Sequence, residues 1–128
     1  HIEELYRVLK SKKFNISHAR LPSYQDHIDF VNNHPYRKWF LIYKESNLMG
    51  SVYITEENVI GINLINEEES TYIEIIQLIV SNHKPNPAIK SIRSKYFLVN
   101  ANPNNKTLMS SLERLGMKKI EITYAYQL

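Results

Sequence analysis

The side chains able to do acid–base chemistry in this sequence are carboxylates, tyrosines and histidines, because the chain contains no cysteine. Thiol nucleophiles, disulfides and Cys-ligated metals are therefore excluded. The histidines show no spacing that suggests a shared metal, so we expect no metal site. Two residues are candidates for moving a proton: Glu57, near a central strand, and Tyr124, on an alternating final strand. Each also has a structural interpretation, Glu57 as a solvated turn carboxylate and Tyr124 as a packing residue, so the general acid and base stay unassigned.

Three further residues are candidates for binding an acceptor substrate. Asn63 and Asn100 are polar residues in otherwise apolar strands, so each needs a hydrogen-bond partner if it is buried, and each can line a cleft. Trp39, beside Arg37 and Lys38, can serve as a flat platform for a substrate or can anchor a buried strand. Both interpretations of Trp39 stay open.

Length and composition predict one domain that spans residues 1–128, since 128 residues with 43% hydrophobic and 23% charged residues match one compact domain. The net charge of +3 is spread in doublets such as Lys12-Lys13 and Lys118-Lys119, and a nucleic-acid interface is usually denser. No apolar run approaches the roughly 20 residues that cross a bilayer. We therefore expect no nucleic acid, no membrane and a cytoplasmic location.

The first half of the chain predicts two helices followed by three antiparallel strands. Residues 3–11 have apolar residues at helical spacing, and a second helix follows Pro22, with Ile28, Phe30 and Val31 pointing inward. The runs 39–43, 50–55 and 59–65 are rich in β-forming residues and are separated by turns at Asn47 and at Glu57-Asn58. A further short strand is predicted at 14–17.

The second half alternates helices and strands. A helix is predicted to begin at about Thr71, because Thr71 and Glu74 form a capping-box signature before a helical apolar stripe. A strand is predicted at 96–100, a helix at 104–115 ended by Gly116, and a final strand at 120–128 with apolar residues at alternate positions. This order predicts an α+β fold with a mixed, mostly antiparallel central sheet flanked by helices.

Two segments resemble the GNAT acyltransferase family. Residues 105–117, NKTLMSSLERLGM, are similar to its late motif N-x-x-(A/S)-x-x-x-(L/Y)-E-K-L-G-F with the same spacing, and residues 58–64, NVIGINL, resemble its central strand A-x-I-G-Y-x-L. The element order resembles that family over almost the whole chain. The resemblance implies a GNAT-like fold and acetyl-CoA as the cosubstrate. The family often has a catalytic tyrosine in the late motif, where this chain has Leu112.

The coenzyme loop of that family departs most from its pattern here. The family's loop R/Q-x-x-G-x-G/A opens a helix whose backbone N–H groups meet the pyrophosphate. The register carried forward from Gly61 puts Glu69 at the Arg/Gln position, Ser70 and Tyr72 at the two glycines, and Glu74 at the final small residue. We expect these side chains, together with the Glu67-Glu68-Glu69 run, to weaken phosphate binding through bulk and like charge. The residues that the resemblance implies for coenzyme contact are Leu64, Ile65, Ser70, Thr71, Tyr72 and Asn105.

Two functions follow from the resemblance and its departures. The first is an N-acetyltransferase that moves acetyl from acetyl-CoA to a primary amine, such as an amino sugar or a peptide N-terminus. The second is a catalytically silent GNAT-like module that binds a partner protein or serves a longer parent chain. A homodimer is also left open.

Overall fold

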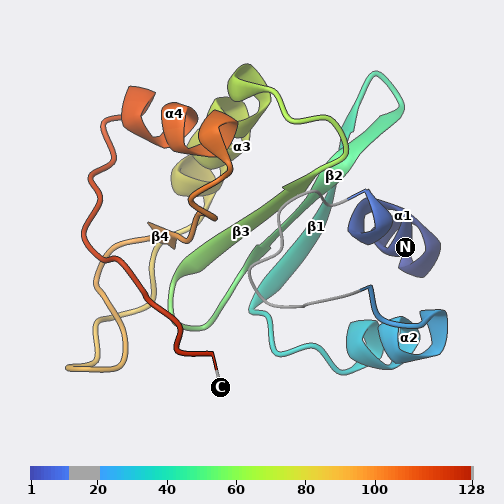
Figure 1. Cartoon of the computed structure of the whole chain (residues 1–128), viewed down its shortest axis with the longest axis horizontal. Coiled ribbons are helices and arrows are strands. Elements are labelled where there is room, and N and C mark those ends of the chain that lie inside the picture. The colour runs from blue at the N-terminus through green and yellow to red at the C-terminus, as the bar shows by residue number, and fades with distance from the viewer. Residues whose placement is uncertain (12–20, 128) are drawn as a thin grey trace.

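The structure is a computed structural model that describes residues 1–11 and 21–127. The predicted strand at 14–17 and the final residue, Leu128, lie outside these residues. The helices and strands follow in the order predicted up to α4 (Figure 1). They are α1 (Ile2–Lys10), α2 (Tyr24–Asn32), β1 (Lys38–Lys44), β2 (Asn47–Ile54), β3 (Val59–Leu64), α3 (Glu69–Asn82), β4 (Leu98–Val99) and α4 (Lys106–Arg114).

The sheet is mixed, as the sequence predicts, with strand order β1-β2-β3-β4. β1, β2 and β3 form the expected antiparallel meander, and β4 joins β3 in parallel. The tight turns use residues with positive φ: Glu45 and Ser46 between β1 and β2, and Asn58 before β3. The described residues therefore confirm an α+β fold.

The main core lies between one face of the sheet and α3. Side chains alternate between the two faces of a strand, so Val52, Ile54, Ile60 and Leu64 point to the same face. They pack against Tyr72, Ile75 and Ile79 of α3 and against Leu108 of α4. α1 contacts β2 and β3, and its buried residues lie outside this cluster. The helices therefore cover the sheet from both sides.

α2 differs from the prediction in the residue that it buries. His27 is buried, and its Nε2 lies 3.0 Å from the carbonyl oxygen of Ile2 in α1. Phe30, predicted to point inward, is 41% exposed. Its ring packs edge-on against Tyr36 and Trp39 at the surface. The prediction for Phe30 is wrong because this aromatic cluster gives the side chain partners without full burial.

Asn58 makes three of the side-chain hydrogen bonds that hold the long connection after α3 to the sheet. Asn58, with φ +71° and fully buried, donates from Nδ2 to the carbonyls of Asn86 at 2.9 Å and Ser94 at 2.8 Å. Its Oδ1 accepts from the Asn86 backbone N–H at 2.7 Å. The connection leads to β4, which has two residues rather than the predicted five. Asn58 therefore fixes the approach to β4.

The C-terminal part confirms one prediction and contradicts another. α4 ends as expected, with Gly116 at φ +80° and the Met117 N–H donating to the Leu112 carbonyl at 3.0 Å. The predicted final strand is wrong, because residues 117–127 have no regular secondary structure. Alternation shows that a segment suits half-burial in a sheet, but it does not supply a neighbouring strand.

Candidate functional site

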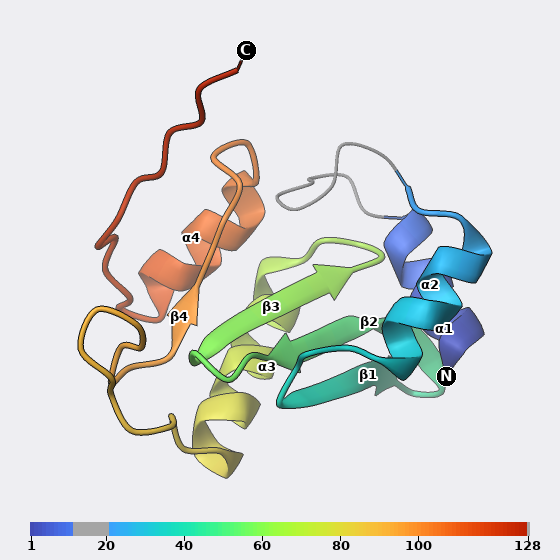
Figure 2. The ribbon, with the colours of Figure 1, turned by 90° about the horizontal axis from the view of Figure 1, so that it is seen from below.

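The sheet opens between β3 and β4. These parallel strands pair only at Val59 with Leu98 and at Ile60 with Val99. Figure 2 shows that they start together and then diverge, because β3 runs toward the side of α1 and α2 whereas the chain after β4 runs beside α4. The divergence of the two backbones, here called the opening, lies between the chain after β3 and the residues that lead into α4. β3 ends at Leu64, one of the residues that the resemblance implies for coenzyme contact.

The backbone of β3 presents polar groups to this opening. The N–H of Thr55 donates to the carbonyl of Val59, and the N–H of Ile65 donates to the carbonyl of Met49, each at 2.9 Å. Since partners alternate along an antiparallel strand, the intervening Ile62 and Leu64 direct their N–H and C=O groups toward β4. Leu64 therefore remains a candidate for contact with an extended ligand, whereas the N–H of Ile65 is already used by β2.

α3 begins earlier than predicted. The helix starts at Glu69 with Glu68 as its N-cap, and no side chain caps it. The first helical bond runs from the Tyr72 N–H to the Glu68 carbonyl at 3.2 Å. Thr71 is buried inside the first turn, so the predicted capping box with Glu74 is wrong. The early backbone N–H groups, including that of exposed Ser70, form an electropositive helix end.

Tyr72 does not occupy the place that the sequence suggested. Its ring is almost fully buried in the main core, so it adds no bulk on the outside of the loop. Its hydroxyl donates to Glu67 Oε1 at 2.6 Å. Burial raises the pKa of this hydroxyl, the Glu67 hydrogen bond and charge raise it further, and a hydrogen bond with Asn105 lowers it. The expected steric obstacle at Tyr72 is therefore absent.

Glu69 is also turned inward. Its Oε1 forms an ion pair with Nε of Arg114, and its Oε2 accepts from Ser110 Oγ at 3.1 Å. Both partners lie on α4, so this carboxylate ties the start of α3 to the neighbouring helix. Only Glu68 of the three glutamates is exposed. The negative charge that the sequence led us to expect in the loop is therefore partly compensated by protein groups.

Asn105, a predicted coenzyme contact, is the N-cap of α4. Its Oδ1 accepts from the Leu108 N–H at 3.1 Å, and the side chain is buried. The side chain also lies beside the Tyr72 hydroxyl. Asn105 thus joins the first turns of α3 and α4, a structural role that explains this residue without a ligand.

We predict that Asn105→Ala lowers the free energy of unfolding by about 1–2 kcal/mol, because it removes a buried helix cap. Asn105→Asp keeps an acceptor oxygen for the Leu108 N–H and should retain more than half of this stability. Urea denaturation of the two variants measures the difference. Equal losses in both would contradict the capping role.

The residues predicted to bind an acceptor substrate do not lie together in the structure. Trp39 is half-buried in a cluster of rings from Phe30, His34 and Tyr36, with centroids 5.0–5.8 Å away. It shares a sheet face with Tyr53, its β2 partner, whose ring fills the space that a Cβ on Gly61 would need. Trp39 is therefore a packing residue of the β1–β2 surface, one strand removed from β3.

Neither acid–base candidate nor the two asparagines form a compact site. Glu57 is exposed at the turn before β3, and the length of β3, about 17 Å, separates it from the loop that leads to α3. Tyr124 is 89% exposed on the chain after α4. Asn63 is half-buried on the sheet face of Tyr53, and Asn100 is exposed. The structure brings Leu64, Ser70, Thr71, Tyr72 and Asn105 to one region, with Ile65 next to Leu64, whereas Glu57, Tyr124 and Trp39 lie elsewhere.

Burial raises the pKa values of Tyr36, to about 12, and of Tyr53 and Tyr72. Below a pH of about 10 the folded and unfolded chains both keep these protons. At higher pH the unfolded chain releases them first, so we predict that the free energy of unfolding falls as the pH rises. Urea titrations at several alkaline pH values measure the slope. Tyr72→Phe should make it shallower, and an identical slope in that variant would refute the contribution of Tyr72.

The sequence did not point to Glu67, Ser110 or Arg114 as partners at this site. Arg114 and Ser110 are one turn apart on α4, so they share the helix face that meets Glu69. That spacing is visible in the sequence, but the partner on another helix is not. Packing of α3 against α4 brings Ser110 and Arg114 to Glu69.

No protein-family model matches the chain, and no curated protein matches it. A solved structure does: a point mutant of TTHA1254 from Thermus thermophilus. It superimposes with a TM-score of 0.58 at 14% identity, over 100% of this chain and 92% of the other. The chain shares this fold with TTHA1254. At this identity the similarity concerns the fold alone.

Within residues 1–11 and 21–127, no helix is long and apolar enough to span a membrane. In the same residues, no group of three or more His, Asp or Glu side chains is arranged to hold a metal ion.

Proposed function

We propose that this chain is a GNAT-type domain that binds acetyl-CoA in the opening between β3 and β4 and transfers the acetyl group to a primary amine. The observation that carries the proposal is the divergence of these strands after two paired residues. It leaves the backbone groups of Ile62 and Leu64 facing the opening, where a pantetheine amide can pair with them as an added strand would. The residue motifs at 58–64 and 105–117 favour the same family.

The start of α3 supports the pyrophosphate end of this proposal. Its first backbone N–H groups have no side-chain cap, and such groups bind phosphate. Tyr72 points into the core, and Glu67 and Glu69 are engaged by Tyr72 and Arg114. The two obstacles that the sequence suggested are therefore smaller in the folded chain. The family's glycines are not needed to avoid a clash at Tyr72.

The transfer step needs an amine in its neutral form near the thioester. The amine nitrogen attacks the thioester carbonyl, the carbon–sulfur bond breaks to release the coenzyme thiolate, the amine loses a proton, and the thiolate takes one up from water. Among the described residues, Glu57 and Tyr124 do not face the opening. In the proposal the proton leaves to water, and catalysis depends mainly on holding the thioester beside the amine. The acceptor class is an amino sugar or a peptide N-terminus, and the cytoplasmic location stays a prediction.

A second function is favoured by the same observation about Glu57 and Tyr124. A domain with neither candidate acid nor candidate base at its opening can bind acetyl-CoA, or a partner protein, without catalysis. This alternative is a silent GNAT-like binding module. It predicts that the chain shows no amine-dependent release of thiol.

The test combines binding with turnover. Amide spectra recorded with acetyl-CoA should show shifts at Ile62, Leu64, Ser70 and Thr71, and thiol release should require an added amine. Ser70→Asp, which adds a carboxylate at an exposed position in the first turn, should weaken both, whereas Gln77→Asp, exposed further along α3, should leave both unchanged. Shifts without thiol release favour the silent module. Shifts confined to other regions would refute the proposed site.

We also predict that Glu69→Gln tightens acetyl-CoA binding about five- to tenfold at low salt. The change removes a carboxylate near the phosphates and frees Arg114, and each close charge interaction there is worth about 1 kcal/mol. Glu74→Gln removes the same charge from an exposed position one turn later and should have a smaller effect. Equal affinities for the wild-type chain and Glu69→Gln would show that this charge does not reach the ligand.

A further inference from the structure

The chain beyond α4 is an uncovered strand-like segment. Residues 118–127, here the C-terminal segment, leave the body after Gly116 and project away from it (Figure 2). Their apolar side chains occupy alternate positions and are highly exposed: Ile120 74%, Ile122 64%, Tyr124 89% and Tyr126 89%. Isolated exposed apolar residues are common, but four in one strand-like stripe mark an interaction surface.

The composition of the C-terminal segment suits a β-strand. Ile, Thr and Tyr favour pleated sheets, and the opposite face carries Lys119, Glu121, Thr123, Ala125 and Gln127. Such a segment needs a neighbouring strand for its backbone and a cover for its apolar face. Among the described residues of the same chain, no strand pairs with the C-terminal segment and nothing covers its apolar side chains.

We propose that the C-terminal segments of two copies of this chain pair as antiparallel strands about a twofold axis at Thr123. In this register the residue numbers of each facing pair add to the same total, so Thr123 faces Thr123 of the second copy. Ile120 then faces Tyr126 of the second copy, and Ile122 faces its Tyr124. Aromatic pairs with β-branched residues and Thr–Thr pairs are among the favourable cross-strand pairs.

Other registers fit less well. A slip that puts odd positions opposite even ones sets the apolar face of one copy on the polar face of the other. A twofold axis at Ile122 places Lys118 opposite Tyr126 of the second copy and breaks one of the two Ile–Tyr pairs. An axis at Tyr124 keeps only one pair of this kind, Ile122 with Tyr126, and sets Tyr124 opposite Tyr124 of the second copy. The Thr123 register keeps both Ile–Tyr pairs and places no like charges opposite each other.

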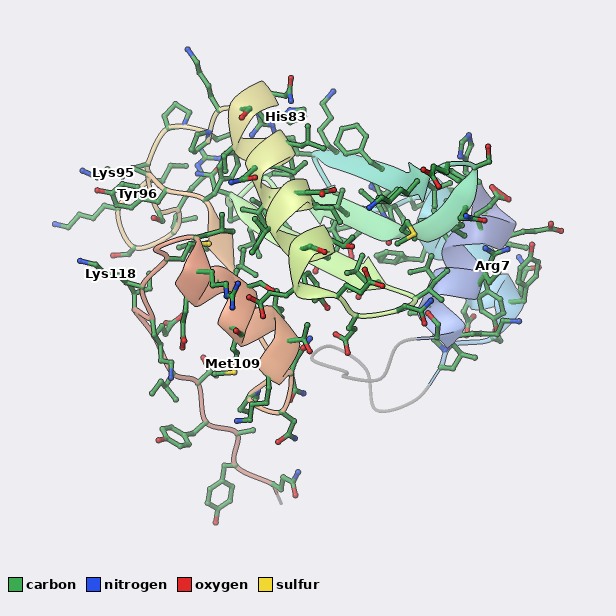
Figure 3. All side chains as sticks on the ribbon, turned by 90° about the horizontal axis from the view of Figure 1, so that it is seen from above. Arg7, His83, Lys95, Tyr96, Met109 and Lys118 are labelled. Carbon is green, nitrogen blue, oxygen red and sulfur yellow. The ribbon has the colours of Figure 1, made fainter. Side chains whose placement is uncertain are left out.

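Area and charge are compatible with this dimer. Eight large apolar side chains, four from each copy, offer on the order of 1,000 Å² to be buried, near the lower limit for specific interfaces. Ile92 and Tyr96, 67% and 62% exposed, precede β4, and Figure 3 shows Lys95, Tyr96 and Lys118 on one flank. That flank gives the paired segments an apolar surface to pack on. The Lys119 side chains of the two copies lie about 27 Å apart, beyond the screening length at physiological salt.

Sedimentation of the 128-residue chain over a wide concentration range tests the dimer. We expect a monomer–dimer equilibrium, and Ile122→Asp should raise the dimer dissociation constant roughly tenfold or more. Leu78→Asp is the matched control, because Leu78 has a similar exposure, 62%, but lies on α3. A chain that stays monomeric at every concentration, or a dimer equally weakened by both variants, would overturn the proposal.

Introduced cysteines test the register, since the chain has none of its own. Thr123→Cys should form a disulfide-linked dimer on mild oxidation because the two sulfurs face each other across the axis. Ala125→Cys alone should cross-link poorly, but a mixture of Ala125→Cys and Glu121→Cys chains should form a mixed dimer. Faster cross-linking of Ala125→Cys alone than of Thr123→Cys would overturn this pairing. The outcome does not depend on whether acetyl-CoA binds.

Discussion

Tyr72→Ala is expected to lower the free energy of unfolding by about 3–5 kcal/mol, the usual cost of truncating a buried aromatic residue. The ring lies in the main core with Ile60, Leu64 and Leu108, so its loss leaves a cavity between the sheet and both later helices. The hydroxyl bond to Glu67 is lost as well. Urea denaturation of the variant measures the change in unfolding free energy.

Tyr72→Phe is the matched control for this prediction. It keeps the ring and removes only the hydroxyl, so it should cost about 1–2 kcal/mol. If Tyr72→Ala and Tyr72→Phe were equally stable, the ring would not be a core residue. The prediction also bears on the coenzyme loop. Tyr72→Gly, which restores the family's glycine, would remove a core ring and unfold the domain before it improved acetyl-CoA binding. Ser70→Gly changes only an exposed position.

Asn58→Ala is expected to cost about 3–4 kcal/mol. The change leaves partly buried backbone groups of Asn86 and Ser94 without their partner, and alanine is disfavoured at positive φ by about 1–2 kcal/mol. Loss of this anchor should also loosen the connection to β4. Chemical denaturation gives the stability, and hydrogen exchange at Leu98, whose N–H donates to the Asn58 carbonyl, reports the connection.

Asn58→Gly separates the two contributions. Glycine accepts positive φ but supplies no side-chain hydrogen bond, so it should be less destabilising than alanine by about 1 kcal/mol. Asn58→Asp places a carboxylate where Nδ2 now faces two carbonyls and should be no better than alanine. A loss of less than about 1 kcal/mol in Asn58→Ala would contradict the anchoring role.

Local patterns predicted the elements that carry their own signals. The meander follows from apolar runs interrupted by turn residues, and the end of α4 follows from Gly116, which takes the positive φ that other residues avoid. The prediction of a final strand at 120–128 is wrong. Alternating residues such as Ile120 and Tyr124 show which face suits burial, but they do not show which part of the protein would cover that face. That information lies outside the segment itself.

The residues that the resemblance implies for coenzyme contact lie near one another in the fold, but their contacts were not predicted. The resemblance placed the candidate site at the end of β3 and the start of α3, where Leu64, Ser70 and Asn105 are now found together. It could not show that Tyr72 faces inward or that Glu69 pairs with Arg114, because both depend on how α3 packs on α4. Side-chain type alone therefore does not show which of these carboxylates has partners within the protein.

Calorimetric titration of the chain with acetyl-CoA at low and moderate salt tests the central claim most directly. Binding in the opening between β3 and β4, with phosphates at the start of α3, predicts saturable micromolar affinity that weakens as salt is added. Absence of heat, and of any thermal shift, at millimolar acetyl-CoA would contradict the proposed coenzyme site.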